Sequence, residues 1–226
     1  MSLVGRVKRT VMKLVGLRRP MSGPPRPHSY EEQIYAAIVR EGDVVFDVGA
    51  NVGEVSLFLS RLAGPSGTVV AFEPVWSVYA RLCRNVQADR CSKAPIITLP
   101  YGLADTVRTA ALQIPNGVFE LASLAEAARW TEAHRGVRLT ECEAAFLTVD
   151  TFMKDQQHRA PHFMKIDVEG AELLVLRGAT RLFADRHRPL MLIELFAPWE
   201  QAFGYGPWDV LSLLSSLGYE FLFACP

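Results

Sequence analysis

The chain has 226 residues and half of them are apolar, so it can bury the core of one large domain, and disorder throughout is excluded. Its net charge of zero is unevenly distributed: residues 1–28 hold seven Lys or Arg and no Asp or Glu. Because the whole chain has 24 residues of each sign, residues 29–226 carry 17 basic against 24 acidic side chains. This acidic body is not expected to bind nucleic acid.

Cysteine spacing and hydropathy favour a cytoplasmic location. The four cysteines form no C-x-x-C pair, and no cluster of Cys and His has metal-finger spacing, which indicates reduced thiols. No apolar run reaches the roughly 18 residues of a membrane span. Charges interrupt the N-terminal apolar positions too often for a signal peptide. No feature of the sequence specifies an oligomeric state.

The N-terminal segment is basic and amphipathic. Apolar residues recur at helical spacing over residues 2–18, which predicts a helix with a basic face. Such a helix is a candidate for peripheral contact of residues 1–19 with an anionic membrane. The alternative, a helix docked on its own domain or a frayed tail, is favoured. Four prolines in Pro20–Pro27 then predict a stiff linker, so the chain divides into residues 1–28 and one domain, 29–226.

The domain alternates between strands and helices. It opens with a capping box, Ser29 as N-cap and Glu32 three residues later, which predicts a helix to about Arg40. Strands are predicted at Val44–Val48, Thr68–Glu73, Pro95–Leu99, His162–Asp167, Pro189–Leu195 and Tyr219–Phe223. Helices are predicted at Glu54–Leu62, Val75–Gln87, Ala171–Ala184 and Trp208–Leu217. This alternation predicts an α/β fold: a doubly wound, mostly parallel, Rossmann-like sheet with helices on both faces.

One region, Val107 to Thr148, interrupts the alternation. It contains a possible strand, VRTAALQIP, a helix-like run, FELASLAEAARWTEAHRG, and a second extended run, AAFLTVD. An excursion of this length in an α/β domain usually lies over the ligand crevice, so it is a candidate substrate lid. A packing role is the equal alternative.

The turn after the first strand has the composition of a ligand site. Gly49, Asn51 and Gly53 follow the buried-type run that ends in Asp47. Glycines let the backbone approach a ligand closely, but G-x-N-x-G is not the G-x-G-x-x-G pattern that binds a pyrophosphate. Asp47 suits a cationic ligand. S-adenosylmethionine, with an ammonium and a sulfonium, is the cofactor that these residues favour.

Acidic residues end the next two strands. Glu73 follows the second strand, where a carboxylate can accept hydrogen bonds from both ribose hydroxyls. Asp105 follows the third strand and is placed to receive the amine of an adenine. Taken alone, either residue is equally well explained as a solvated acid at the end of a strand. With the glycine turn, the acids predict an adenosine site along this edge of the sheet.

The fourth and fifth strands add a second group of charges. Alternation places Lys165, Asp167 and Glu169 on one face of a strand expected to be buried on both sides. Glu194 lies near the end of the fifth strand. Since strands one, four and five are neighbours in a doubly wound sheet, these acids and Asp47 are expected to converge on one crevice. The alternative is an internal pair of Lys165 with one acid, the others being solvated.

Several enzyme classes are excluded by missing motifs. The histidines have no H-x-x-H or H-E-x-x-H spacing, no serine lies in a G-x-S-x-G elbow, and no P-loop occurs. An NAD-dependent reductase shares the sheet but predicts a pyrophosphate loop that this chain lacks.

The strings FDVGANVG, AFEP, GLAD, LTVDTF, MKIDVEGAELLVLRGA and LMLIEL occur in this order. They resemble the FkbM-type S-adenosylmethionine-dependent methyltransferases over about Glu41 to Tyr219. The resemblance implies the class I methyltransferase fold in residues 29–226 and O-methylation of hydroxyls on sugars or polyketide-type natural products. It also implies site roles: Asp47, Gly49, Asn51 and Gly53 at the methionine end, Glu73 at the ribose, Asp105 by the adenine, and Asp167, Glu169 and Glu194 where acceptor meets methyl group.

Two departures from the family pattern stand out. Many relatives carry a His near the position of Phe196, whereas this chain reads ELFAPW. The chain also ends directly after the sixth strand, whereas the class I sheet adds an antiparallel seventh. The fold is therefore expected to lack that last strand, leaving an edge for a partner, the basic N-terminal segment or the linker to cover.

The expected reaction needs a group that takes the proton of the acceptor hydroxyl. We hypothesise that Asp167 is the general base or orients the hydroxyl, and that Glu169 and Glu194 place the acceptor. In a variant, Asp167 and Glu194 hold Mg²⁺, although the sequence has no specific metal motif. The rival hypothesis is a catalytically inactive cofactor-binding or protein-interaction module on the same fold.

Overall fold

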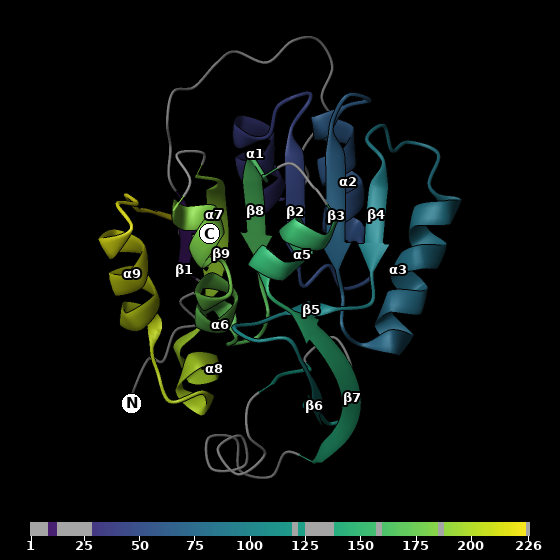
Figure 1. Ribbon diagram of the computed structural model, residues 1–226. Helices are drawn as coiled ribbons and strands as arrows, with labels where there is room; N and C mark the ends of the chain where they lie inside the picture. The colour runs from purple at the N-terminus through teal and green to yellow at the C-terminus, as the bar shows by residue number, and fades with distance from the viewer. Residues whose placement is uncertain are drawn as a thin grey trace, which may run out of the picture.

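The computed structural model describes residues 9–12, 29–118, 122–124, 138–156, 160–184 and 188–224. Its centre is a seven-stranded sheet in the order β10-β1-β9-β8-β2-β3-β4 (Figure 1). The strands are β1 (Arg9–Met12), β2 (Val44–Val48), β3 (Thr68–Phe72), β4 (Ile96–Leu99), β8 (Phe163–Ile166), β9 (Leu190–Leu195) and β10 (Leu222–Ala224). The five strands from β4 to β9 in this order are parallel, which confirms the doubly wound α/β fold.

Strand β2 lies at the middle of the sheet because it is apolar on both faces. All five of its residues are buried. Val44, Phe46 and Val48 pack into the core on one face, and Val45 packs into the core on the other. After β2 the chain moves outward to β3 and β4, and later returns on the other side of β2 to form β8. The carboxyl ends of β2 and β8 therefore mark the topological switch point, where open α/β sheets bind ligands.

Helices cover both faces of the sheet (Figure 1). One face is covered by α1 (Tyr30–Ile38), α2 (Glu54–Ala63) and α3 (Trp76–Ala88). The other face packs against α5 (Val149–Gln156), α6 (Glu172–Arg177), α7 (Thr180–Ala184) and α9 (Pro207–Ser216). The predicted capping box is confirmed, since Ser29 Oγ accepts the Glu32 N–H at 3.1 Å and Glu32 accepts the Ser29 N–H at 3.3 Å. None of the helices in the described ranges is long and apolar enough to cross a membrane.

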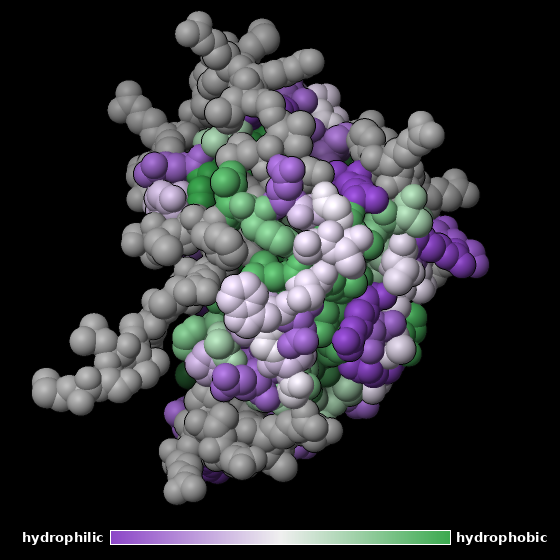
Figure 2. Space-filling view, turned by 90° about the vertical axis from the view of Figure 1, so that its left-hand side faces the viewer, coloured by the Kyte–Doolittle hydropathy of each residue, from purple (hydrophilic) through white to green (hydrophobic). Residues whose placement is uncertain are grey.

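The side of the molecule that carries α9 shows apolar patches between polar ones (Figure 2). Helix α9 follows the same division, because it buries Val210 and Leu214 and leaves Trp208 71% exposed. Only one face of α9 therefore packs on the core, where the helix contacts α6.

The predicted helix Ala171–Ala184 consists of two helices, α6 and α7. A Cβ on Gly178 would lie 2.1 Å from the carbonyl oxygen of Ala104, so the chain passes too close to its neighbour for a side chain. Asp150 then caps α7, accepting the Arg181 N–H at 2.9 Å and the Leu182 N–H at 3.2 Å. A separate cap at α7 explains the break, because the first N–H groups of a helix need partners.

The excursion after β4 forms a second sheet of three strands in the order β5-β7-β6. These are β5 (Gly102–Leu103), β6 (Arg108–Pro115) and β7 (Leu139–Leu147). The strand predicted from Val107 is confirmed as β6. The second extended run begins earlier, at Leu139, and the chain from Val149 is helix α5. The helix-like run 119–136 lies outside the described residues except for 122–124, where Ser123 bridges Gln113.

The antiparallel strand of the main sheet comes from the N-terminal segment. β1 lies between β9 and β10 and is antiparallel to both, Thr10 facing Glu194 on one side and Ala224 on the other. The helix predicted over residues 2–18 is therefore wrong at Arg9–Met12, and its remaining residues lie outside the described ranges. Hydrogen bonding explains the difference, since β9 and β10 would otherwise each leave a row of backbone groups unpaired. The N-terminal segment thus lies inside the sheet, between β9 and β10, and β10 is the outermost strand on this side.

Deleting residues 1–28 is expected to destabilise the whole domain, because β9 and β10 both lose their pairing with β1. The measurement is thermal unfolding, in which each kcal/mol lost lowers Tm by about 2–4 °C for a domain of this size. Deleting residues 1–8 alone, which precede β1, is the control. Equal melting curves for the two deletions would show that β1 adds nothing to the fold.

Candidate functional site

A cavity of about 410 Å³ lies at the carboxyl ends of β2, β3 and β8. Its volume is within the usual range for small-molecule sites, roughly 300–1,000 Å³. The turn after β2, the start of α2, the end of β3 and the loop after β8 form its walls, and β5, β6 and β7 close it from the second sheet. The switch point of the sheet is thus a preformed pocket.

The turn after β2 approaches the loop after β8 very closely. A Cβ on Gly49, whose φ is +78°, would lie 1.9 Å from the carbonyl oxygen of Asp167. Asn51 also has a positive φ of 52°, and its N–H donates to Glu73 Oε2 at 3.0 Å. Gly53 serves a different need: it is the N-cap of α2, and a Cβ there would lie 2.4 Å from Leu82 of α3. Glycine is thus required at position 49 because the two loops touch there. It is required at position 53 because α2 packs closely against α3.

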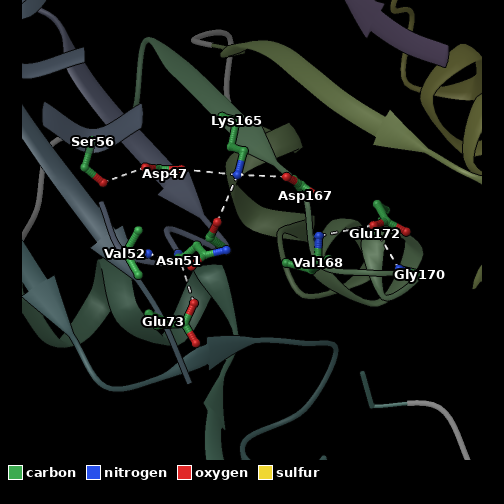
Figure 3. A network of polar contacts seen from close by, with 11 residues as sticks. Asp47, Asn51, Val52, Ser56, Glu73, Lys165, Asp167, Val168, Gly170 and Glu172 are labelled. Atoms are coloured by element: carbon green, nitrogen blue, oxygen red, sulfur yellow. Dashed lines mark hydrogen bonds and ion pairs between the residues drawn. The ribbon is translucent and has the colours of Figure 1, made fainter. Parts of the chain in front are cut away.

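A buried ammonium connects β2, the turn and β8 (Figure 3). Lys165 Nζ donates to the Gly49 carbonyl at 2.9 Å and lies 3.1 Å from Asp167 Oδ2 and 3.6 Å from Asp47 Oδ1. Asp47 is fully buried and accepts a hydrogen bond from Ser56 Oγ at 2.5 Å. Burial alone would lower the pKa of Lys165, but the charges of Asp167 and Asp47 outweigh it and raise that pKa. Lys165 is therefore cationic and holds both carboxylates in place.

Glu73 lies at the edge of the cavity, directly after β3. It is 6% exposed and accepts the Asn51 N–H at 3.0 Å and the Val75 N–H at 2.9 Å. Burial raises its pKa to about 7, against the opposing effect of these two hydrogen bonds. Its charge therefore changes near neutral pH.

The loop after β8 carries Asp167 and Glu169 into the cavity. Glu169 and Gly170 both have positive φ, +51° and +97°, so the chain turns sharply between β8 and α6. Ser123 Oγ donates to the Glu169 carbonyl at 2.9 Å and links this loop to the excursion Val107–Thr148. Four residues of that excursion line the cavity: Leu112, Ala122, Leu124 and Phe146. It therefore forms one wall of the pocket.

Five of the nine residues expected at the site line the cavity: Gly49, Asn51, Glu73, Asp167 and Glu169. The other four lie elsewhere. Asp47 is buried under Lys165, and Gly53 is in the packing contact with Leu82. Asp105 pairs with Arg108 at 3.2 Å. Glu194 is not at the strand tip, because β9 runs on to Leu195 and pairs with β1 beside it.

One buried acid behind this loop, at the start of α6, was not among the residues expected from the sequence. Glu172 is 2% exposed and its Oε1 accepts the N–H groups of Gly170 at 3.1 Å and Val168 at 3.3 Å. The sequence holds a signal for it, because Glu172 is followed at helical spacing by Val175 and Leu176, which are buried. A Glu on the apolar face of a helix is rare unless it has partners.

The described ranges contain no group of three or more His, Cys, Asp or Glu side chains that could hold a metal ion. The pairing of Asp167 and Glu194 around Mg²⁺ also lacks geometric support, since Asp167 faces Lys165 and Glu194 lies beside β1.

The parallel sheet, the glycine turn and the acidic cavity at the switch point define an α/β methyltransferase of class I type. The profile of the methyltransferase FkbM domain matches residues 47–221. The chain belongs to this family, and its cofactor is S-adenosylmethionine.

Two relatives align over most of the chain. The hexuronic acid methyltransferase AglP of Haloferax volcanii is 29% identical over 180 residues, which are 77% of this chain and 62% of that protein. The methyltransferase sdnD of Sordaria araneosa is 28% identical over 197 residues, 78% of this chain and 73% of that protein. This chain thus spans less than two thirds of the length of the first relative.

A shorter match and a solved structure come from the same family. The 31-O-demethyl-FK506 methyltransferase FkbM of Streptomyces tacrolimicus is 50% identical over 52 residues, 23% of this chain and 20% of that protein. A crystal structure of methyltransferase FkbM from Methylobacillus flagellatus KT covers 82% of this chain and 43% of its own, with a TM-score of 0.47 and 18% identity.

Replacing Lys165 by Met is expected to lower the free energy of unfolding by about 3–5 kcal/mol, because Asp47 stays buried without its cation. Urea unfolding measures the change. The exposed Lys154→Met is the control. Adding Asp47→Asn to Lys165→Met is expected to recover part of the loss, since a neutral amide is less costly to bury than a carboxylate. An unfolding free energy equal to that of the wild type in Lys165→Met would contradict the role given to Lys165.

Proposed function

We propose that this methyltransferase transfers the methyl group of S-adenosylmethionine to a hydroxyl group of a sugar, a glycan or a natural product. The observation that carries the proposal is the position of Asp167. Its carboxylate lines the cavity together with Glu73, and Lys165 holds one of its oxygens at 3.1 Å. A fixed carboxylate beside a cofactor-sized pocket is what proton transfer from a hydroxyl requires.

The charges of the cavity suit the cofactor. Among the described lining residues, four are carboxylates and one is an ammonium: Glu54, Glu73, Asp167, Glu169 and Lys165. This excess of negative charge favours a ligand that carries a sulfonium and an ammonium. Helix α2 begins at the cavity wall with Glu54 and Val55, and the positive end of its macrodipole suits the carboxylate of the methionine moiety. Glu73 is placed to accept hydrogen bonds from ribose hydroxyls.

When bound, S-adenosylmethionine supplies an electrophilic methyl group and leaves as S-adenosylhomocysteine. Asp167 orients the acceptor hydroxyl and takes its proton as the oxygen attacks. Its side chain is about one-third exposed, so an acceptor can reach it, whereas the buried Lys165 prevents it from rotating away. Glu169, on the same loop, faces the cavity and helps to place the acceptor.

An oxygen acceptor is supported by one relative, which is named for a 31-O-demethyl substrate. Another relative, the hexuronic acid methyltransferase, supports a sugar acceptor. The wall formed by Leu112, Leu124 and Phe146 offers apolar surface to the acceptor. Sugar rings and polyketide chains both carry hydroxyls on apolar carbon frameworks.

For the N-terminus, we retain the division into residues 1–28 and the methyltransferase domain 29–226 as a proposal. Strand β1 modifies this division, because it joins part of residues 1–28 to the sheet of the domain. Peripheral contact of residues 1–19 with an anionic membrane stays a prediction from their basic composition.

The test is incubation with labelled S-adenosylmethionine and a panel of methyl glycosides of neutral hexoses, of hexuronic acids, and of polyketide alcohols. Label is expected on a hydroxyl oxygen. Asp167→Asn is expected to lower kcat by about 10²–10⁴-fold with little change in KM for the cofactor, because the amide cannot take a proton. Glu143→Gln, which removes an exposed carboxylate of β7, is the control.

Other outcomes would contradict parts of this proposal. The hydroxyl proposal fails if the label appears only on nitrogen or carbon, or if no acceptor is methylated. The role of Asp167 fails if Asp167→Asn keeps the kcat of the wild type. Activity that persists in excess chelator would remove the Mg²⁺ variant.

A further inference from the structure

The loop after β8 has an unfavourable backbone conformation at Glu169. Its φ of +51° is uncommon for a residue other than glycine. Gly170 follows with a φ of +97°, and a Cβ there would lie 2.8 Å from the backbone of Trp199 in α8 (Ala197–Ala202). Such conformations persist only where the surrounding structure holds the chain. The contacts that hold this loop therefore decide where Asp167 and Glu169 lie.

Two side chains that follow the loop in the chain hold part of its backbone. Glu172 Oε1 accepts the N–H groups of Val168 at 3.3 Å and Gly170 at 3.1 Å (Figure 3). The Tyr205 hydroxyl donates to the Gly170 carbonyl and accepts the Leu173 N–H at 3.2 Å. Neither Glu172 nor Tyr205 lines the cavity. These contacts hold the residues on both sides of Glu169 but not its carbonyl.

The Glu169 carbonyl is held by Ser123, a residue of the excursion Val107–Thr148. The Ser123 hydroxyl donates to this carbonyl at 2.9 Å, across 46 residues of sequence. Ser123 is 1% exposed and does not line the cavity, so it is not placed to touch a substrate. Its hydroxyl instead joins the second sheet to the loop that carries Asp167.

Ser123 is itself held by the second sheet. Its N–H donates to the Gln113 carbonyl at 2.9 Å, and its carbonyl accepts the Gln113 N–H at 2.7 Å. Gln113 belongs to β6 and is 5% exposed, and its Nε2 donates to Glu141 of β7 at 2.8 Å. The Ser123 hydroxyl therefore reaches the loop from a fixed position, as a donor must in order to restrain its acceptor.

The two neighbours of Ser123 in the chain contact the cavity. Ala122 and Leu124 both line it, whereas Ser123 between them does not. In an extended segment, alternate residues lie on the same side. Three consecutive residues thus provide both a wall for the acceptor and a hydrogen bond to the loop that carries the base.

We infer that Ser123 is a positioning residue of methyl transfer, whose hydroxyl ties the loop after β8 to the cavity wall and so sets Asp167 and Glu169 against an acceptor on that wall. The inference rests on the proposed function for its catalytic part. Without the hydroxyl, the partly buried Glu169 carbonyl loses this partner, and the loop keeps its unfavourable φ with one contact fewer. Asp167 then spends less time in the geometry that proton transfer requires.

The part of the cavity assigned to the cofactor depends on other contacts. Lys165 holds the Gly49 carbonyl, and Glu73 holds the Asn51 N–H. Loss of the Ser123 hydroxyl is therefore expected to change turnover and leave binding of the cofactor product unchanged.

The first experiment measures the loop without using activity. Amide hydrogen exchange is followed by mass spectrometry in peptides that cover residues 166–173. Exchange in Ser123→Ala is expected to be roughly tenfold faster than in the wild type, because a hydrogen bond that restrains the loop is lost. Equal exchange in the two proteins would overturn the contact as a restraint on the loop.

The matched control is Ser60→Ala. Ser60 of α2 is also fully buried, and its hydroxyl donates to the Ala94 carbonyl at 2.7 Å, but it does not line the cavity. The same substitution there removes a comparable hydrogen bond away from the loop. It is expected to leave exchange of residues 166–173 as in the wild type.

The second experiment measures positioning, with labelled S-adenosylmethionine and the methyl glycoside panel. Ser123→Ala is expected to lower kcat by about 10–100-fold, since a misplacement of about 1 Å costs roughly 100-fold. Its affinity for S-adenosylhomocysteine and its binding stoichiometry in calorimetry are expected to equal those of the wild type. Ser123→Cys, similar in shape but a weak donor, is expected to show the same loss and serves where Ser123→Ala does not fold.

Two results would overturn positioning: a kcat of Ser123→Ala equal to that of the wild type, or an equal loss of kcat in Ser60→Ala. If the wild type methylates no member of the panel, the proposed function fails, and hydrogen exchange still decides whether Ser123 restrains the loop. The two failures are therefore distinguishable.

Discussion

The arrangement of this site depends on one buried ammonium. Lys165 lies beside Asp47 in the register of β8 and β2, so the pairing of two central strands brings the charges together. Each of these charges would be costly to bury alone, but together they compensate one another and bind the Gly49 carbonyl. The turn after β2 and the carboxylate of Asp167 take their positions from this contact. Asp47, which the sequence predicts at the ligand, is buried beside Lys165.

A second theme is the use of carboxylates to hold loop backbone. Glu73 binds N–H groups beside the end of β3, Glu172 after β8 and Glu200 after β9. Loops at the carboxyl edge of a parallel sheet have few backbone partners of their own, and a buried carboxylate satisfies two at once. The walls of the cavity are therefore preformed. Burial raises the pKa both of Glu73, which lines the cavity, and of Glu172, which lies behind its wall.

The sequence predicts well those features that local pattern and general topology determine. Apolar runs of five or six residues located β2, β3 and β9, and right-handed crossovers placed β2, β8 and β9 side by side. Residues that directly follow strands at the switch point, such as Glu73 and Asp167, therefore meet in the cavity. The features that the sequence did not predict depend on partners remote in the chain. They are the burial of Asp47 beside Lys165 and the strand β1, whose helical spacing is outweighed by the need of β9 and β10 for hydrogen bonds. Asp105 pairs with Arg108, and its place by the adenine stays a prediction.

The most direct test is calorimetric titration of the protein with S-adenosylhomocysteine between pH 6 and pH 8. One saturable site per chain is expected, with affinity that rises as Glu73 ionises near its pKa of about 7. Glu73→Gln is expected to bind about tenfold more weakly and without this rise, because it lacks the charged acceptor for the ribose. Absence of saturable binding, or a Glu73→Gln variant with the affinity and pH dependence of the wild type, would contradict the assignment of this cavity to the methyl donor.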